Sequence, residues 1–385
     1  MISINEKADN CCGCGLCEKV CPNNSINMLC DCNGFLYPSV NFETCTNCGL
    51  CEKVCAFRNK TDKETDFIQK YYAARSVCDD VLVKSASGGV FTVVSDVVLG
   101  MGGAVYGAVF DESFCVVHNR ADDENGRNTM RGSKYVQSDI RAVYNSIAKD
   151  LSEDRYVIFT GTPCQVDAVK SYCELREINT DKLFLCDLIC HGVNSPKLWR
   201  ENLEYLRGKI GDISFATMRD KKYGSGYHMT VKGEHGSYSK HGSEDPFIRI
   251  FQKNYALRSS CFNCPYKCYD RISDLTIGDF HKAKQYHSEY CDGKGISVVL
   301  VNSQKGEWLM EKCSTNMSLC ESTKEYTAQP NLLEQIKNRT ERDEFFRYYN
   351  CNSFVSVLKK YTEVGIKNRL VGIAKRTAKM ILRRK

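Results

Sequence analysis

The 385-residue sequence lacks any long hydrophobic run. A helix that crosses a bilayer needs roughly 18 or more consecutive apolar residues, and no such stretch occurs. The beginning of the chain, MISINEKADNCC, also lacks the apolar core of a secretory signal. We therefore expect a cytoplasmic protein, and a chain of this length is expected to form two or three domains.

The sequence also lacks a strong charge over most of its length, because its net charge of +6 is concentrated at one end. Residues 358–385 carry a net charge of +9, which leaves −3 on the rest and argues against a nucleic-acid partner. In this tail Ile366, Leu370 and Ile373 recur at helical spacing, which predicts an amphipathic basic helix. Such a helix suits either an anionic surface, such as the inner membrane face, or the acidic body of the protein or a partner. We slightly favour the second, because the apolar face is short.

Cysteine, in contrast, is abundant. The chain contains 24 cysteines, and eleven of them lie within residues 11–55. Because no secretory signal is present and the chain is large, we expect reduced thiols or metal ligands rather than a disulfide scaffold.

The clustered cysteines form two runs with the same spacing. The octapeptide CGLCEKVC occurs at 14–21 and again at 48–55, and each copy completes a C-x2-C-x2-C-x3-C pattern. This is the spacing of bacterial two-cluster ferredoxins, in which the fourth cysteine of each run binds the other cluster. An internal repeat of this kind predicts a pseudo-twofold module.

The spacing therefore predicts two 4Fe-4S clusters. One is expected to be bound by Cys11, Cys14, Cys17 and Cys55, and the other by Cys45, Cys48, Cys51 and Cys21. Zinc is the alternative, but it would leave the third cysteine of each run unexplained. Cys12, Cys30 and Cys32 fall outside the pattern and are predicted to be bystanders, while Asn33-Gly34 is expected to close a hairpin.

From about residue 70 the pattern changes to alternating strands and helices. The segment 85–92 opens an apolar helix, and 104–110 reads as a strand. Ser87 is expected to cap this helix and leave the N–H groups of Gly88, Gly89 and Val90 free for a phosphate or another anion. A plain helix cap explains the same residues equally well.

Three further segments bring cysteines to turns. A strand at 157–160 precedes Pro163, which is expected to begin a helix and so to place Cys164 at its amino terminus. A second strand at 183–190 ends at Cys190, with Ser195-Pro196 beginning the next helix, which runs to about residue 206. A third strand at 275–279 follows a loop with three cysteines, Cys261, Cys264 and Cys268. Two or more of these cysteines, with one each from the earlier turns, could complete a third cluster. The spacing alone does not establish it, because these thiols would meet only in the fold. The Gly-rich stretch 224–242, with three histidines, is expected to form a solvated hairpin or mobile loop.

Seven segments of the body, taken together and in order, carry a family resemblance. They read SASGGVFT (85–92), GGAVYGAVF (102–110), RGSKYVQS (131–138), FTGTPCQ (159–165), CHGVNSPKLW (190–199), RSSCFNCPYK (258–267) and SDLTIGDF (273–280). In these segments the chain resembles the coenzyme F-420 hydrogenase/dehydrogenase beta-subunit family. The resemblance implies a flavoprotein that binds FAD and passes electrons between iron–sulfur clusters and a substrate on the flavin. It leaves the substrate open, because family members include deazaflavin-reducing subunits and a reductase of chlorophyll intermediates.

The resemblance also implies site residues. It assigns Ser87, Gly88, Gly89, Thr92 and Ser133 to the flavin or its substrate. Lys134 and Tyr135 are the candidate catalytic residues, with Lys134 facing a phosphate or the charge of the reduced flavin. The candidate ligands of a third 4Fe-4S cluster are Cys164, Cys190, Cys261 and Cys264, with Cys186 and Cys268 in reserve.

We therefore expect a mixed α+β fold, with a ferredoxin-like module at 1–60, an α/β flavin-binding body and a basic helical tail at 330–385. The body is expected to consist of parts at 70–150 and 151–325. The expected function is an oxidoreductase that relays electrons from a ferredoxin-like donor through 4Fe-4S clusters to FAD and an organic small-molecule acceptor. Archaeal family members occur beside hydrogenase or formate dehydrogenase partners, whereas this chain carries its own ferredoxin-type cysteines. The alternatives are an iron–sulfur carrier or docking subunit without a substrate, and a zinc-stabilised binding module.

Overall fold

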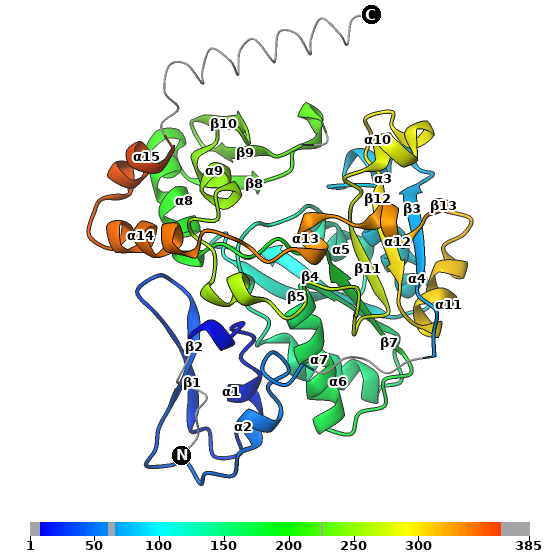
Figure 1. The fold of residues 1–385 in the computed structure, drawn as a ribbon, viewed down its shortest axis with the longest axis horizontal. Helices are drawn as coiled ribbons and strands as arrows, with labels where there is room; N and C mark the ends of the chain where they lie inside the picture. Colours follow the sequence, from blue (N-terminus) through cyan, green and yellow to red (C-terminus); the bar gives the residue numbers. More distant parts are fainter. Residues whose placement is uncertain (1–7, 61–65, 225, 363–385) are drawn as a thin grey trace, which may run out of the picture.

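The computed structural model describes residues 8–60, 66–224 and 226–362, which form a mixed α/β structure with three sheets (Figure 1). The predicted mixture of helices and strands is confirmed. Residues 363–385, which contain Ile366, Leu370 and Ile373 of the predicted amphipathic basic helix, lie outside the described residues. Among the helices described, none has the length and apolarity required to cross a membrane.

The amino-terminal module is a small hairpin with short helices (Figure 1). Its elements are η1 (Ala8–Asn10), α1 (Leu16–Val20), β1 (Ile26–Cys30), β2 (Leu36–Val40) and α2 (Leu50–Lys53). Strands β1 and β2 pair antiparallel, and Gly34 in their connection has a φ of 90°, as expected for the predicted Asn-Gly turn. Helices α1 and α2 each follow a glycine in the left-handed conformation, Gly15 at 74° and Gly49 at 72°. The sequence repeat is thus also a structural repeat.

The body is built on one eight-stranded sheet with the order β13-β3-β12-β11-β7-β6-β4-β5. Its strands are β3 (Lys70–Ser76), β4 (Ala104–Phe110), β5 (Val116–Ala121), β6 (Val157–Gly161), β7 (Leu183–Leu188), β11 (Leu275–Asp279), β12 (Ser297–Val301) and β13 (Met317–Glu321). The central strands β4, β6, β7 and β11 run parallel, and the flanking pairs are antiparallel. Both expected parts of the body, 70–150 and 151–325, contribute strands to this sheet.

Helices cover both faces of the sheet. They are α3 (Asp79–Val83), α4 (Val90–Gly100), α5 (Glu124–Met130), α6 (Val143–Ser152), α7 (Pro163–Leu175), α10 (Ala283–Tyr286), α11 (Gln304–Lys312), α12 (Lys324–Thr327) and α13 (Pro330–Leu333), with η4 (Ser288–Tyr290). Successive residues of a strand point to opposite faces. Accordingly, Val105 packs in the core beneath α4 and α11, whereas Tyr106 packs in the core beneath α6 and α7. Leu16 and Val20 of the module belong to this second core, which joins the module to the α6–α7 face.

A third, three-stranded sheet packs against helices of its own. It consists of β8 (Ile213–Thr217), β9 (His228–Gly233) and β10 (Gly236–His241). Nearby helices are α8 (Pro196–Ile210), α9 (Pro246–Gln252), α14 (Arg339–Tyr349) and α15 (Phe354–Thr362), with η2 (Lys221–Tyr223) and η3 (Ser259–Asn263). The predicted hairpin in 224–242 is present, but its prediction as a solvated or mobile segment is wrong for β9. Met229 and Val231 are fully buried in the same core as Trp199 of α8.

Candidate functional site

Four cysteines of the module line a small cavity of about 20 Å³. We call them the outer thiol set: Cys21, Cys45, Cys48 and Cys51. Three come from the second sequence run and one from the first. Cys48 is exposed, whereas Cys51 is buried, so this set reaches the protein surface on one side.

The other four cysteines of the two runs also lie together. We call Cys11, Cys14, Cys17 and Cys55 the middle thiol set. Burial, followed by the neighbouring Cys14, Cys11 and Cys55, raises the pKa of the Cys17 thiol. Burial and Cys14 likewise raise the pKa of Cys55 to about 11. Thiols that are buried side by side resist ionisation unless a cation compensates for the thiolate charge.

A buried arginine of the body reaches into the module beside the middle thiol set. Arg258, which is 1% exposed, donates from Nε to the carbonyl of Cys11 at 2.7 Å and from one terminal nitrogen to the carbonyl of Leu36 at 2.8 Å. The same terminal nitrogen lies 3.5 Å from the sulfur of Cys11, and the guanidinium stacks 4.2 Å from the ring centroid of Tyr37. Gly13 leaves room for it, because a Cβ there would lie 2.6 Å from the guanidinium.

A third group of cysteines lines a cavity of about 40 Å³ in the body. We call Cys164, Cys190, Cys261 and Cys264 the inner thiol set. Cys164 lies in the first turn of α7, Cys190 follows β7, and the other two lie in and just after η3. Burial raises the pKa of Cys261 to about 11 and that of Cys264 to about 12.

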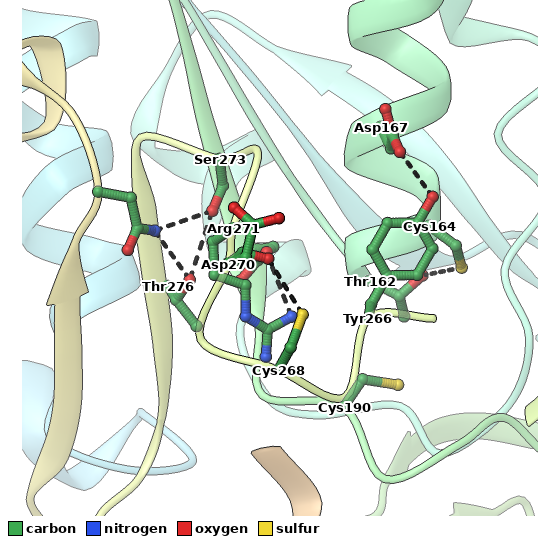
Figure 2. Close-up of polar contacts among 12 residues, drawn as sticks. Thr162, Cys164, Asp167, Cys190, Tyr266, Cys268, Asp270, Arg271, Ser273 and Thr276 are labelled. Atoms are coloured by element: carbon green, nitrogen blue, oxygen red, sulfur yellow. Dashed lines mark hydrogen bonds and ion pairs between the residues drawn. The ribbon is translucent and has the colours of Figure 1, made fainter. Parts of the chain in front are cut away.

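Hydrogen bonds fix the three segments that carry the inner thiol set. The hydroxyl of Tyr266 donates to Asp167 of α7 at 2.6 Å, which ties the Cys261–Cys264 loop to the helix of Cys164 (Figure 2). Lys267 donates from Nζ to the carbonyl of Cys190 at 2.7 Å. The predicted helix start at Pro163 is confirmed, and Gln165 accepts a hydrogen bond from the backbone N–H of Thr162 just before it.

The two reserve cysteines lie elsewhere. Cys268 turns toward the carbonyl of Asp270, at 3.2 Å, and does not line the cavity of the inner thiol set (Figure 2). Cys186 is buried within β7 in the apolar core of the sheet.

Cys12 has surroundings that the sequence did not indicate. It lines the same cavity as the inner thiol set, and the neighbouring thiols of Cys14 and Cys164, together with burial, raise the pKa of the Cys12 thiol. The Cys12 thiol is in turn the largest cause that lowers the pKa of Cys14 to about 7. Cys12, which the spacing predicts to be a bystander, thus lies beside the inner thiol set. The available signal was the doubled Cys11-Cys12, which the ferredoxin spacing does not require.

A larger cavity of about 280 Å³ lies beside the inner thiol set. The two cavities share a wall formed by Thr162, Gln165 and the segment 190–193. Cys190 borders both cavities. The wall is formed by the turns that follow β6 and β7, at the carboxyl ends of parallel strands, where ligands of α/β proteins commonly bind.

Most of the residues that the family resemblance assigns to a cofactor line this larger cavity. They are Ser87, Gly89, Thr92, Ser133, Lys134 and Tyr135. Gly88 is not among the lining residues, because it packs against β12 and donates its N–H to the hydroxyl of Ser297 at 2.9 Å.

The expected helix cap at Ser87 is wrong. Helix α4 begins at Val90, and its N-cap is Gly89 with a φ of 82°. The hydroxyl of Ser87 instead donates to the carbonyl of Ile296 at 2.8 Å. Because the N–H of Gly88 is also occupied, the free triplet of N–H groups that the sequence predicted does not form.

Lys134 is half-buried and lies shortly after the carboxyl end of α5. Its Nζ lies 3.2–3.4 Å from four backbone carbonyls, those of Thr129, Met130, Arg131 and Gly132. These carbonyls favour the ammonium form, while burial lowers the pKa of Lys134 to about 7. The side chain thus caps the helix and borders the cavity.

Two cations that the sequence did not single out hold the Ser-Gly-Gly loop in place. Arg219 donates to the carbonyl of Ala86 at 2.8 Å, to the hydroxyl of Tyr135 at 3.0 Å and to Asp279 at 2.9 Å. Lys221 donates to the carbonyl of Ser87 at 2.7 Å. Both lie between β8 and β9, so the third sheet positions one wall of the cavity in the body.

Several buried polar atoms along the larger cavity lack a hydrogen-bond partner among the described residues. They are Oγ1 of Thr92, Nδ1 of His118 and Nε of Arg131. Nε2 of His118 lies 2.9 Å from the carbonyl of Thr160, which assigns the ring proton to Nε2 and leaves Nδ1 as an acceptor. Since buried polar groups are normally paired, these atoms fit a polar ligand. His191, in contrast, has both ring nitrogens paired, with Asn331 and Asn254.

Comparison with known proteins adds a family. Residues 154–326 match the family model for the carboxyl-terminal part of the coenzyme F420 hydrogenase/dehydrogenase beta subunit. Through this segment, the chain is similar to the beta-subunit family. The resemblance noted in the sequence is confirmed, and the beta-subunit segment includes all four members of the inner thiol set. The amino-terminal module lies outside the match.

The chain was also compared with solved structures and with curated proteins. A chain of the F420-reducing NiFe hydrogenase complex from Methanosarcina barkeri is similar, with 16% identity and a TM-score of 0.44. The similarity covers 80% of this chain and 97% of that one. No curated protein matches the chain.

Proposed function

We propose that this protein is an iron–sulfur flavoprotein oxidoreductase. Its three thiol sets would each hold a 4Fe-4S cluster, and its larger cavity would hold the flavin of FAD. When bound, these groups would supply the electron transfer to an organic acceptor, and the protein would position them and tune their potentials. The wall shared by the two cavities is the observation that carries the proposal, because electron transfer requires the inner cluster and the flavin to be neighbours.

The order of the thiol sets supports a relay. The outer set includes the exposed Cys48, where a ferredoxin-like donor protein could approach. Cys12 follows Cys11 of the middle set in the chain and lines the cavity of the inner set, and Cys190 of the inner set also lines the larger cavity. This order runs from the surface to the cavity and supports electron entry at the module.

The thiol chemistry supports iron as the bound metal. Buried thiols with raised pKa values hold their protons at neutral pH, and a coordinated metal removes this cost because it stabilises the thiolate. Two sets of four cysteines with one member exchanged between sequence runs match the ligand pattern of paired cubanes. Zinc would explain four ligands in each set but not this exchange.

The unpaired atoms of the larger cavity support a polar ligand such as a flavin. Thr92 presents a hydroxyl, His118 an acceptor nitrogen and Arg131 a donor. A volume of about 280 Å³ is close to the lower end of the range for small-molecule sites and suits a ring system better than a whole dinucleotide. The adenosine part of FAD would therefore extend beyond this cavity.

The protein groups near the proposed flavin have separable roles. Tyr135 and Lys134 remain our candidate catalytic residues, since both line the cavity. Arg219 lies 3.0 Å from the hydroxyl of Tyr135, and its positive charge favours the ionised form of that hydroxyl, while burial raises the pKa of Tyr135. Tyr135 would therefore keep its proton at neutral pH and hold it beside the cavity.

The test is flavin content and electron transfer in an anaerobic preparation. We expect stoichiometric FAD, together with reduction of the bound flavin by chemically reduced ferredoxin. Cys261→Ser should lose the inner cluster and slow flavin reduction, whereas Cys351→Ser, which changes an exposed cysteine far along the chain, should do neither.

Two further results bear on the proposal. A preparation with clusters but without flavin would overturn it in favour of an electron carrier that has no substrate. Because the family description names coenzyme F420, oxidised F420 should be one of the acceptors tested beside a simple quinone.

A further inference from the structure

A histidine, a glutamate and a cysteine meet at the edge of the eight-stranded sheet. His287 directly follows α10, Glu289 lies in η4, and Cys320 lies in β13, the edge strand. One potential ligand atom from each side chain, a ring nitrogen, a carboxylate oxygen and a sulfur, lies within 4.8 Å of the other two. None of the three residues lines a cavity described above, so this group is separate from the thiol sets.

The imidazole of His287 is held as a metal ligand requires. It is 4% exposed, and its ring centroid lies 5.1 Å from that of Phe280. Nε2 lies 3.0 Å from the hydroxyl of Ser322, whose backbone N–H donates to the carbonyl of Tyr71 at 2.8 Å. A metal-binding histidine usually donates its second ring N–H to such a partner, which fixes the tautomer and the orientation of the ring. Nδ1 is then left as an acceptor, and it lies 3.8 Å from a carboxylate oxygen of Glu289.

The spacing and the chemistry of the three ligand atoms suit zinc. Zinc lies about 2.0–2.2 Å from nitrogen or oxygen and about 2.3 Å from sulfur, so the ligand atoms of a tetrahedral site stand roughly 3.3–3.6 Å apart. The 3.8 Å between His287 and Glu289 is close to this range, and the side chain of Glu289, 60% exposed, has room to move. A thiolate and an imidazole favour zinc over magnesium or calcium, which prefer oxygen ligands. An ion pair between His287 and Glu289 is the alternative, but it gives Cys320 no role.

We propose that His287, Glu289 and Cys320 bind a zinc ion, with water in the fourth position. Three protein ligands leave one position of a tetrahedral site open to water or to another small ligand. On binding, the thiol of Cys320 loses its proton to solvent, and the ion compensates for the charges of the thiolate and the carboxylate. The zinc would join the α10–η4 segment to β13. This site does not depend on the proposed clusters or flavin.

The experiment titrates ZnCl2 into anaerobically prepared protein that has been treated with EDTA, in competition with a chromophoric chelator. We expect one zinc ion to bind per chain without loss of iron. Zinc X-ray absorption should show a single sulfur among nitrogen and oxygen neighbours. Ser322→Ala should weaken zinc binding by roughly 10–100-fold, as loss of an outer partner of a metal ligand commonly does. Cys320→Ala, which removes a ligand, should weaken it further.

A matched pair of carboxylate variants separates ligation from charge. Glu289→Gln changes an exposed side chain and should weaken zinc binding without altering the fold. Glu321→Gln removes the same charge from an exposed residue next to Cys320 in β13, where successive side chains point to opposite faces. We expect this control to bind zinc as the wild type does.

Three results would overturn the inference. Zinc surrounded by sulfur alone would belong to a thiol set, and wild-type affinity in Cys320→Ala would exclude that cysteine as a ligand. Absence of zinc binding to the wild-type protein would leave only the ion pair. A failure of the proposed function is recognised separately, because iron and flavin are measured before any zinc is added.

Discussion

Replacing Arg258 by methionine should separate the amino-terminal module from the body. Arg258 belongs to the beta-subunit segment but donates two of its hydrogen bonds to the module, to the carbonyls of Cys11 and Leu36. A third bond goes to the side-chain oxygen of Gln137 at 3.0 Å. Methionine keeps much of the apolar chain but has no donor.

The magnitude follows from the acceptors left behind. Three buried oxygens lose their donor, and each such loss costs roughly 1–3 kcal/mol. The methionine variant no longer pays the desolvation cost of a buried charge, which offsets part of this sum. We therefore expect the free energy of unfolding to fall by about 3 kcal/mol or more. Arg258→Lys should be intermediate, because one ammonium does not reproduce the fork of a guanidinium.

The assay is urea unfolding under anaerobic conditions, together with the potential of the middle cluster. We expect a lower urea midpoint and a lower potential, because the positive charge beside Cys11 is gone. Arg347→Met removes an exposed arginine of α14 and is the matched control. The reasoning would be refuted if Arg258→Met unfolded at the same urea concentration as this control.

Three further perturbations have defined outcomes. Gly15→Ala and Gly49→Ala impose the same left-handed strain of roughly 1–2 kcal/mol. Only the new methyl group at position 15 meets a neighbour, Arg141, so the melting temperature of Gly15→Ala should fall further. Equal decreases in melting temperature would contradict the predicted packing. Burial lowers the pKa of His118 to about 4, so the unfolded state takes up a proton first as the pH falls from about 6.5 to 4, and stability should decline by up to about 3 kcal/mol. His118→Gln should remove that part of the pH dependence of the urea midpoint, and an unchanged profile would argue against it. Thr92→Val should leave the unliganded fold intact but weaken flavin binding several-fold in a titration, by about 1 kcal/mol; wild-type affinity would show that Oγ1 does not contact the ligand.

Local patterns predicted the elements that depend on local physics. The strands at 104–110 and 275–279 form with the predicted bounds, because β-branched and aromatic residues alternate there between two covered faces. The helix start at Pro163 also forms as expected, because proline suits the first turn. The two left-handed glycines before α1 and α2 reflect the exact sequence repeat.

These local patterns could not predict contacts between distant segments of the chain. Arg219 and Lys221 hold the Ser-Gly-Gly loop from more than 130 positions along the chain, and no local spacing indicates such a contact. Ser87 failed as a cap because the backbone bends at Gly89 and turns the serine toward β12. Cys12 was set aside because it falls outside the ferredoxin spacing, although the fold places it on the cavity of the inner thiol set.

Iron and acid-labile sulfide, measured on wild-type protein purified without oxygen, test the central claim most directly. Three cubanes predict about twelve irons and as many sulfides per chain, four for each cluster, together with a brown colour. A colourless protein that contains zinc and no sulfide would contradict the account. A value near eight irons would retain the module's two clusters but reject the one proposed for the inner thiol set.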